Sequence, residues 1–166
     1  MLKKLFGKKE VPSEETIFAP LNGKAVKIEE VPDPTFSQKM MGDGIAIEPA
    51  DGNVVSPVDG TVIQLFHTKH AIGIKSQSGL ELLIHIGLET VMMNGEGFEA
   101  HVKEGDKVKT GDKLITFDMD LIREKAASTI TPLVITNVDT VENIEKQYEE
   151  NAVGGKTQVM DVKTKS

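Results

Sequence analysis

The sequence predicts an all-β protein, an antiparallel β-sandwich of the duplicated barrel-sandwich type with short peripheral helices. From Ile17 onward, short runs of Val, Ile and Leu are interrupted about every 8 to 12 residues by Asn-Gly, Asp-Gly, Ser-Gly or Gly-Asp, as is typical of sandwiches and barrels. Residues 20–26 (PLNGKAV) are echoed by residues 57–63 (PVDGTVI), and each copy predicts a proline-limited turn that leads into a strand. A third turn-rich stretch, residues 103–115, has two Gly-Asp turns on either side of Val108. Two copies without a continuing period indicate a doubled sandwich rather than a solenoid.

No long helical period appears before Asp120, and the predicted helices are short. Residues 120–127 predict a short helix with acidic residues in its first turn, and residues 141–149 predict a second helix capped by Thr140. We expect the final segment, residues 156–162, to return as an edge strand.

Length and composition favour one domain, over residues 16–166, after a flexible basic segment over residues 1–15. The chain of 166 residues has no Trp and one Tyr, so its core has to be built from Val, Ile, Leu and Met. The basic start is not followed by the apolar stretch of a secretory signal, and no apolar run approaches membrane-spanning length. We therefore expect a free-standing cytoplasmic protein.

Charge and cysteine content exclude several classes of function. The formal net charge of -7 argues against nonspecific nucleic-acid binding, which requires a basic face, and suits a partner protein with a basic patch. The lack of Cys excludes disulfides, a thiolate nucleophile and a thiolate metal site.

The first ten residues are a candidate for weak contact with a membrane surface. Leu2, Leu5 and Phe6 fall at helical spacing among lysines, and an anionic surface attracts such segments. A solvated tail is the better interpretation of so short a segment.

Two histidines stand out in a predicted hairpin. Two apolar runs, residues 66–74 and 80–87, flank a short Ser- and Gly-rich turn. With a two-residue turn centred after Gln77, His70 pairs directly with His85, and the Cβ atoms of such a pair lie roughly 4.5 to 5.5 Å apart. A three-residue loop would shift this register and separate the two histidines.

Period-two alternation places further residues on the same face as the two histidines: Phe66, Thr68, Leu83, Gly87 and Glu89. Because Gly87 has no side chain, we expect it to leave room there for a close approach. A lone His on an apolar strand is usually structural, but two adjacent imidazoles need a shared ligand to satisfy their nitrogens. His67 falls on the opposite face and His101 has no partner, so we interpret both as surface residues.

Of three chemistries that could use the pair, phosphoryl transfer fits best. A zinc hydrolase needs a third protein ligand and a general base, yet there is no His-Glu-x-x-His or His-x-His motif. A hydrolytic triad needs a nucleophile in a sharp turn, and Gly-x-Ser-x-Gly is absent. In phosphoryl transfer, His85 attacks in line while His70 and Thr68 donate hydrogen bonds to the equatorial oxygens. No nucleotide-binding loop is present, so the donor is expected to be another protein.

These segments resemble a known family. Residues 82–91 (LLIHIGLETV) are similar to the signature around the phosphorylated histidine of glucose-type enzyme IIA, and residues 68–71 (TKHA) are similar to its ancillary-histidine segment. The similarity runs from about Ile17 to Asn151, and its other blocks are GDGIAI at 42–47, PVDGT at 57–61, NGEGF at 94–98 and STITP at 128–132.

The resemblance implies a phosphohistidine carrier of the sugar phosphotransferase system with a β-sandwich fold. It implies phosphorylation of His85 by the phosphocarrier protein HPr, support from His70 and Thr68, and onward transfer to a cysteine on the IIB domain of a sugar permease. Partners are expected to contact a shallow apolar depression around the histidines, at Asp33, Phe36, Phe66, Leu83, Gly87 and Glu89. Glu89 stands where well-known members of the family have Asp. This difference keeps the negative charge and makes the side chain longer.

The resemblance implies no required cofactor for the transfer. Some relatives regulate other proteins when unphosphorylated and share a zinc ion with them at these histidines, so His70 and His85 are also candidate zinc ligands. That role varies among relatives, and the sequence does not assign it to this chain.

Two other classes of protein remain open. A lipoyl-like carrier is suggested by the Gly-Thr-Val at residues 60–62 and by residues 105–115, but such carriers present a Lys at a hairpin tip, and Lys39 precedes the Gly-Thr-Val segment. A metallopeptidase-like sandwich is the enzyme alternative, but this sequence lacks the metal ligands that such an enzyme needs.

Overall fold

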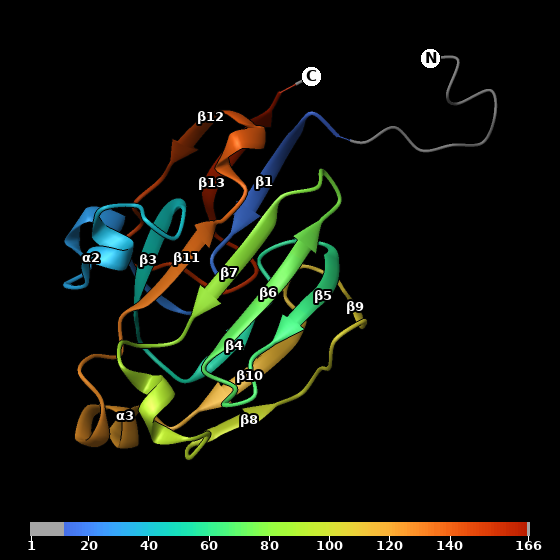
Figure 1. The fold of residues 1–166 in the computed structure, drawn as a ribbon. Helices are drawn as coiled ribbons and strands as arrows, with labels where there is room; N and C mark the ends of the chain where they lie inside the picture. Colours follow the sequence, from blue (N-terminus) through green and yellow to red (C-terminus); the bar gives the residue numbers. More distant parts are fainter. Residues whose placement is uncertain (1–11, 166) are drawn as a thin grey trace.

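The computed structural model describes residues 12–165, which are mostly β-strand (Figure 1). The strands are β1 (Glu14–Phe18), β2 (Gly23–Lys27), β3 (Asp43–Pro49), β4 (Asn53–Val55), β5 (Gly60–Leu65), β6 (Ala71–Ser76), β7 (Glu81–His85), β8 (Phe98–Ala100), β9 (Lys107–Val108), β10 (Lys113–Phe117), β11 (Thr131–Ile135), β12 (Val141–Lys146) and β13 (Gln158–Thr164). Between them lie the α-helices α2 (Pro34–Ser37) and α3 (Met119–Lys125) and the 3-10 helices η1 (Ile28–Glu30), η2 (Thr90–Met93) and η3 (Val138–Thr140). The paired strands run antiparallel, which confirms the predicted all-β class.

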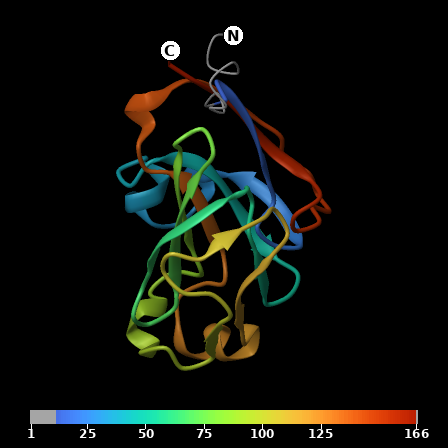
Figure 2. The same cartoon turned by 90° about the vertical axis from the view of Figure 1, so that its right-hand side faces the viewer.

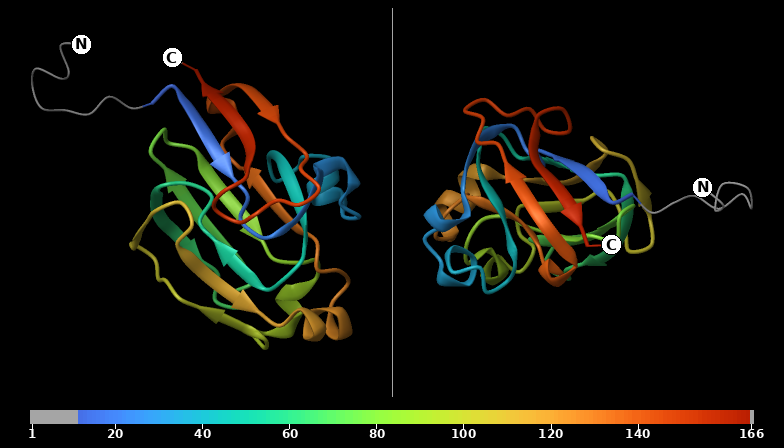
Figure 3. Two further views of the ribbon diagram at one scale, coloured as in Figure 1. Left: turned by 180° about the vertical axis from the view of Figure 1, so that it is seen from behind. Right: turned by 90° about the horizontal axis from the view of Figure 1, so that it is seen from above.

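The described strands form one large sheet and two small ones. The large sheet has the order β2-β3-β11-β7-β6-β5-β9, and the small sheets have the orders β1-β13-β12 and β4-β10-β8. Figure 3 (left) shows both small sheets from behind, with β1 and β13 above β4 and β10. The main core lies between the large sheet and the small ones, where Ile45, Ile84, Leu114 and Val162 are buried together. Aliphatic side chains dominate this core, as predicted for a chain without Trp.

The large sheet carries a second apolar cluster on its other face. Alternation along β7 divides its side chains, because Leu82 and Ile84 belong to the main core whereas Leu83 belongs to the second cluster with Val134. Phe36 of α2 is only 2% exposed in this cluster, and Figure 1 shows α2 beside β3. This outer cluster is the floor of the candidate site.

The predicted turns are present. Both proline-limited turns lead into strands, β2 in the first copy and β5 in the second. The two Gly-Asp turns share one geometry: the carboxylate of Asp106 accepts the N–H of Lys103 at 3.0 Å, and the carboxylate of Asp112 accepts the N–H of Lys109 at 2.8 Å.

The first of the two predicted helices is confirmed as α3, and the second is wrong. Asp118 caps α3 by accepting the N–H of Leu121 at 3.1 Å. The segment 141–149 instead contains β12, which pairs with β13, and its Val141 and Ile144 pack against the main core. This tertiary pairing outweighs the helix preference of a segment with three Glu, one Lys and one Gln.

The C-terminal strand also differs from expectation. We predicted an edge strand over residues 156–162, but β13 lies between β1 and β12 and is the central strand of its sheet. The reason is that β12, the segment predicted as a helix, pairs with the side of β13 that would otherwise be an edge.

The N-terminal part of the described chain belongs to a sheet. β1 begins at Glu14, so two residues of the segment 1–15, which we expected to be flexible, are in a strand. The proposed membrane-contact segment, residues 1–10, lies outside the described residues. Within residues 12–165, no helix has the length and apolar character needed to span a bilayer.

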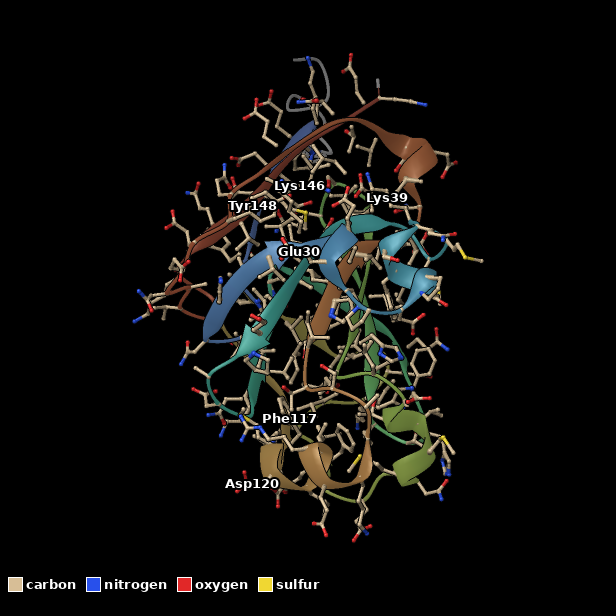
Figure 4. All side chains as sticks on the ribbon, turned by 90° about the vertical axis from the view of Figure 1, so that its left-hand side faces the viewer. Glu30, Lys39, Phe117, Asp120, Lys146 and Tyr148 are labelled. Atoms are coloured by element: carbon tan, nitrogen blue, oxygen red, sulfur yellow. The ribbon has the colours of Figure 1, made fainter. Side chains whose placement is uncertain are left out.

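Ion pairs join the segment after α2 to two sheets. Lys146 of β12 donates to Asp43 at the start of β3 at 2.7 Å, and Lys39 lies 3.8 Å from the same carboxylate oxygen and 3.3 Å from Glu29. Figure 4 shows Lys39 and Lys146 in the same half of the molecule, far from α3. Because Lys146 and Asp43 are partly buried, their attraction is screened less than that of an exposed pair.

Gly44 is a position in β3 where the sheet leaves no room for a side chain. A Cβ atom there would lie 2.0 Å from the carbonyl oxygen of Leu133 on β11. Gly44→Ala should therefore lower the free energy of unfolding by about 1–3 kcal/mol or more, measured by urea denaturation. Gly73→Ala on β6 is the control, because its Cβ would meet ordinary contacts at 3.5 Å and beyond. Equal stability of the two variants would contradict this packing.

Candidate active site

The hairpin that carries the histidines has a longer loop than predicted. Ser76 is the last residue of β6, and its N–H donates to the carbonyl of Leu80 at 2.8 Å, which closes a three-residue loop. This register pairs His85 with Ala71. The predicted direct pairing of His70 with His85 is therefore wrong by one position.

His70 nevertheless lies beside His85, because it is not part of the strand. It precedes β6 in irregular backbone that follows Lys69, whose φ is 61°. The carbonyl of His70 accepts the N–H of Ile86 at 2.7 Å, which ties this backbone to the end of β7. Because strand alternation does not continue through a left-handed residue, the side chain of His70 is not bound to the face that alternation would give it. The two imidazole rings lie with their centroids 5.1 Å apart.

Apolar side chains surround both imidazoles. Phe36 of α2 lies 5.2 Å from His85, and Phe66 lies 5.5 Å from His70, measured between ring centroids. Leu83, only 7% exposed, belongs to the same outer cluster. His70 is 5% exposed, whereas His85 is partly exposed and is the more accessible of the two rings.

A backbone carbonyl orients His85. Its Nδ1 atom lies 2.8 Å from the carbonyl oxygen of Gly87. Because a carbonyl oxygen only accepts hydrogen bonds, Nδ1 must carry the hydrogen, and the neutral ring keeps its lone pair on Nε2. His85 is therefore arranged to act as a base or nucleophile through Nε2.

Thr68 holds the second imidazole. Its hydroxyl oxygen lies 2.5 Å from Nδ1 of His70, and a hydroxyl can donate or accept. When Thr68 donates, His70 carries its hydrogen on Nε2, and the single hydroxyl hydrogen of Thr68 is not available for the phosphoryl oxygens to which we expected it to donate. In that arrangement one ring of the pair offers a lone pair and its neighbour offers a hydrogen-bond donor.

Burial favours the neutral form of both imidazoles. Desolvation, with the charge of His85 as the smaller cause, lowers the pKa of His70 to about 4. Desolvation also lowers the pKa of His85, although the Gly87 carbonyl and Asp33 act in the opposite direction. These two groups favour positive charge on the His85 ring, which develops when Nε2 bonds to an electrophile.

The turn after β7 contains two left-handed residues, Gly87 with a φ of 71° and Glu89 with a φ of 61°. A Cβ atom on Gly87 would lie 2.7 Å from both the Ser128 carbonyl oxygen and the Thr90 methyl, so the chain itself fills the space that we expected to serve a close approach. Thr90 was not among the predicted site residues, yet it is fully buried and donates its hydroxyl to the carbonyl of Ile86 at 2.6 Å. A Thr four residues after Ile86, the spacing at which a hydroxyl can reach a backbone carbonyl, is the signal that could have marked it. Figures 1 and 2 show η2, which begins at Thr90, beside α3.

The two predicted acidic residues lie on different segments. Asp33 caps α2 by accepting the N–H of Thr35 at 3.0 Å, and its charge partly opposes the lowering of the His85 pKa by burial. Glu89 is exposed in the turn that follows β7. One acidic side chain therefore comes from the start of α2, whose Phe36 contacts His85, and the other comes from the turn that contains Gly87.

Two imidazoles alone do not make a zinc site. Among the residues that the structure describes, no group of three or more His, Asp or Glu side chains could hold a metal ion. Zinc is bound by three or four protein ligands, so His70 and His85 do not fit a resident zinc ion on this chain by itself. His67 and His101 are exposed and lie outside the pair, with His101 hydrogen-bonded to Thr116 at 3.0 Å.

Known proteins resemble this chain over nearly its whole length. Residues 15–141 match the family model described as phosphoenolpyruvate-dependent sugar phosphotransferase system, EIIA 1. The PTS system glucose-specific EIIA component of Bacillus anthracis is 64% identical over 165 residues, which cover 99% of this chain and 100% of that protein. The protein of the same name from Halalkalibacterium halodurans is 59% identical over 170 residues, and the aligned region covers 98% of this chain and 98% of that protein.

A solved structure shares the fold as well. Glucose permease IIA from Mycoplasma capricolum superposes with a TM-score of 0.81 at 35% identity, over 92% of this chain and 98% of that one. Its similarity extends to the sandwich as a whole, and the family match includes the hairpin with both histidines. The chain therefore belongs to the EIIA type-1 family of the phosphoenolpyruvate-dependent sugar phosphotransferase system.

Proposed function

We propose that the chain is a phosphohistidine carrier that accepts a phosphoryl group from HPr on Nε2 of His85. It then passes the group to a cysteine on the IIB domain of a glucose-type sugar permease. The observation that carries this proposal is the hydrogen bond from His85 to the Gly87 carbonyl, which leaves Nε2 free beside His70. Membership of a phosphotransfer family supports the same role.

The proposed transfer needs no proton exchange at His85. The lone pair on Nε2 forms a bond to phosphorus while the bond from phosphorus to the donor nitrogen breaks in line, and that electron pair stays on the donor imidazole. The His85 ring gains positive charge, which the Gly87 carbonyl and Asp33 stabilise. In onward transfer the IIB thiolate attacks phosphorus, and the electron pair of the N–P bond returns to Nε2. The hydrogen on Nδ1 stays in place throughout.

His70 is proposed to stabilise the phosphoryl group. With a pKa of about 4 it is neutral at physiological pH, so it supplies an N–H donor rather than a full positive charge. Donation from Thr68 to Nδ1 directs the hydrogen of His70 to Nε2. Burial and packing against Phe66 hold the ring in place, so the donor is oriented before the substrate phosphoryl group arrives.

The surroundings of the histidines suit a partner with an apolar surface and basic side chains. Phe66 is partly exposed and supplies an apolar contact, and Asp33 and Glu89 supply negative charge. Phe36 and Leu83, which we expected to contact partners, are buried and instead pack against the site from within. The formal net charge of -7 favours the approach of a basic partner surface.

Replacement of the proposed nucleophile should abolish phosphate uptake without unfolding the protein. In His85→Gln the strand keeps its buried neighbours Leu82 and Ile84, which hold β7 in the core. Incubation with phosphoenolpyruvate, enzyme I and HPr should add one acid-labile, alkali-stable phosphoryl group to the wild type and none to the variant, measured by intact mass. His101→Gln changes an exposed histidine and should leave labelling complete. Stoichiometric labelling of His85→Gln would exclude His85 as the acceptor.

Replacement of His70 should slow the transfer without preventing bond formation at His85. Gln keeps a donor at position 70 but moves it, and the loss of one oriented donor costs about 2.7–4 kcal/mol of barrier, or roughly a hundred- to a thousandfold in rate. His70→Gln should still become phosphorylated slowly and should pass the group poorly to the IIB cysteine, measured by rapid quench with labelled phosphate. Label on residue 70 in the wild type would reverse the two roles, and unchanged onward transfer would leave His70 without a role in the reaction.

A further inference from the structure

Two hydrogen bonds hold the peptide planes on either side of Gly87. The plane before Gly87 contains the Ile86 carbonyl, which accepts the hydroxyl of Thr90 at 2.6 Å. The plane after it contains the Leu88 N–H, which donates to the carbonyl of Ser128 at 2.9 Å. The carbonyl of Gly87, which accepts the hydrogen of His85 Nδ1, belongs to this second plane. The direction in which this carbonyl points relative to His85 depends on the orientation of both peptide planes.

Gly87 does not maintain this conformation by itself. Its φ of 71° lies in a region that Gly populates about as readily as negative φ, so rotation about its backbone bonds meets little intrinsic resistance. The direction of its carbonyl has to be set by neighbours. Thr90 is one of them, because it is fully buried and its methyl group packs against Gly87.

The peptide groups of Ile86 connect Thr90 to both histidines. The N–H of Ile86 donates to the carbonyl of His70 at 2.7 Å, and the carbonyl of Ile86 accepts the Thr90 hydroxyl. His85 directly precedes Ile86 in the chain. The buried hydroxyl of Thr90 therefore holds Ile86, the residue that follows His85 and is hydrogen-bonded to the backbone of His70.

We infer that Thr90 is a positioning residue for the phosphoryl transfer: its hydroxyl fixes the peptide between Ile86 and Gly87 so that the Gly87 carbonyl receives the Nδ1 hydrogen of His85. Nε2 then remains the nucleophile. The inference rests on the proposed role of His85. Without the hydroxyl, the turn relaxes, Nδ1–H loses its acceptor, and the hydrogen of His85 distributes between both ring nitrogens.

Variants at position 90 separate the hydroxyl from the shape of the side chain. Thr90→Val removes the hydroxyl and keeps the branched shape, whereas Thr90→Ser keeps the hydroxyl and removes the methyl. The rate of phosphorylation of His85 by phosphorylated HPr should fall about tenfold or more in Thr90→Val, because a misplaced nucleophile reacts slowly, and Thr90→Ser should restore it. If valine does not allow folding, Thr90→Ala and Thr90→Ser give the same comparison.

Ser56→Ala is the matched control for lost stability. Ser56 is also fully buried and donates its hydroxyl to the carbonyl of Val58 at 2.6 Å, in the connection between β4 and β5. Its removal deletes the same kind of hydrogen bond as Thr90→Val. The phosphorylation rate of Ser56→Ala should equal that of the wild type.

Nitrogen-15 NMR of the unphosphorylated proteins gives a readout that a loss of stability does not change. His85 should be the Nδ1–H tautomer in the wild type, in Thr90→Ser and in Ser56→Ala, and a mixture of tautomers in Thr90→Val. A wild-type tautomer or a wild-type rate in Thr90→Val overturns the inference. If His85 of the wild type takes up no phosphoryl group, the proposed function fails, and the tautomer measurement still tests the role of Thr90.

Discussion

His85 donates its Nδ1 hydrogen to the carbonyl of Gly87 at 2.8 Å, and the chemistry of the site depends on this bond. A neutral imidazole can carry its hydrogen on either nitrogen, so a ring without such a partner offers no fixed nucleophile. Here the partner is a backbone group, and its position follows from a turn with two left-handed residues, Gly87 and Glu89. The same carbonyl favours positive charge on the ring, which the proposed bond from Nε2 to phosphorus would create.

The sheet gives this turn a fixed base. β7 lies between β6 and β11 in the interior of the seven-stranded sheet, so the strand that ends at His85 is hydrogen-bonded on both sides. α2 covers the outer face and places Phe36 against the ring, while ion pairs of Asp43 join the segment after α2 to β12. The site is therefore built on a central strand of the sheet and on a short helix packed against it.

The turn spacing was enough to predict the all-β class, and the two histidine segments were enough to predict the pair. The exact register was not predictable, because the loop of the hairpin is set by a distant residue: Glu15 of β1 accepts hydrogen bonds from the hydroxyls of Ser76 and Ser78. The strand β12 was missed for a similar reason, since its partner β13 comes later in the chain. Local patterns do not contain such long-range contacts. Thr90 was missed because its role depends on burial and on one hydrogen bond within a turn.

The ring nitrogen that carries the phosphoryl group shows whether the Gly87 carbonyl selects the nucleophile of His85. Phosphorus and nitrogen NMR of the phosphorylated wild-type protein distinguishes phosphohistidine bonded through Nε2 from phosphohistidine bonded through Nδ1. Because the Gly87 carbonyl holds the hydrogen on Nδ1, the phosphoryl group should be bonded to Nε2 of His85. Phosphorylation at Nδ1 would contradict the account, since it requires the hydrogen bond to Gly87 to be broken and the ring to turn.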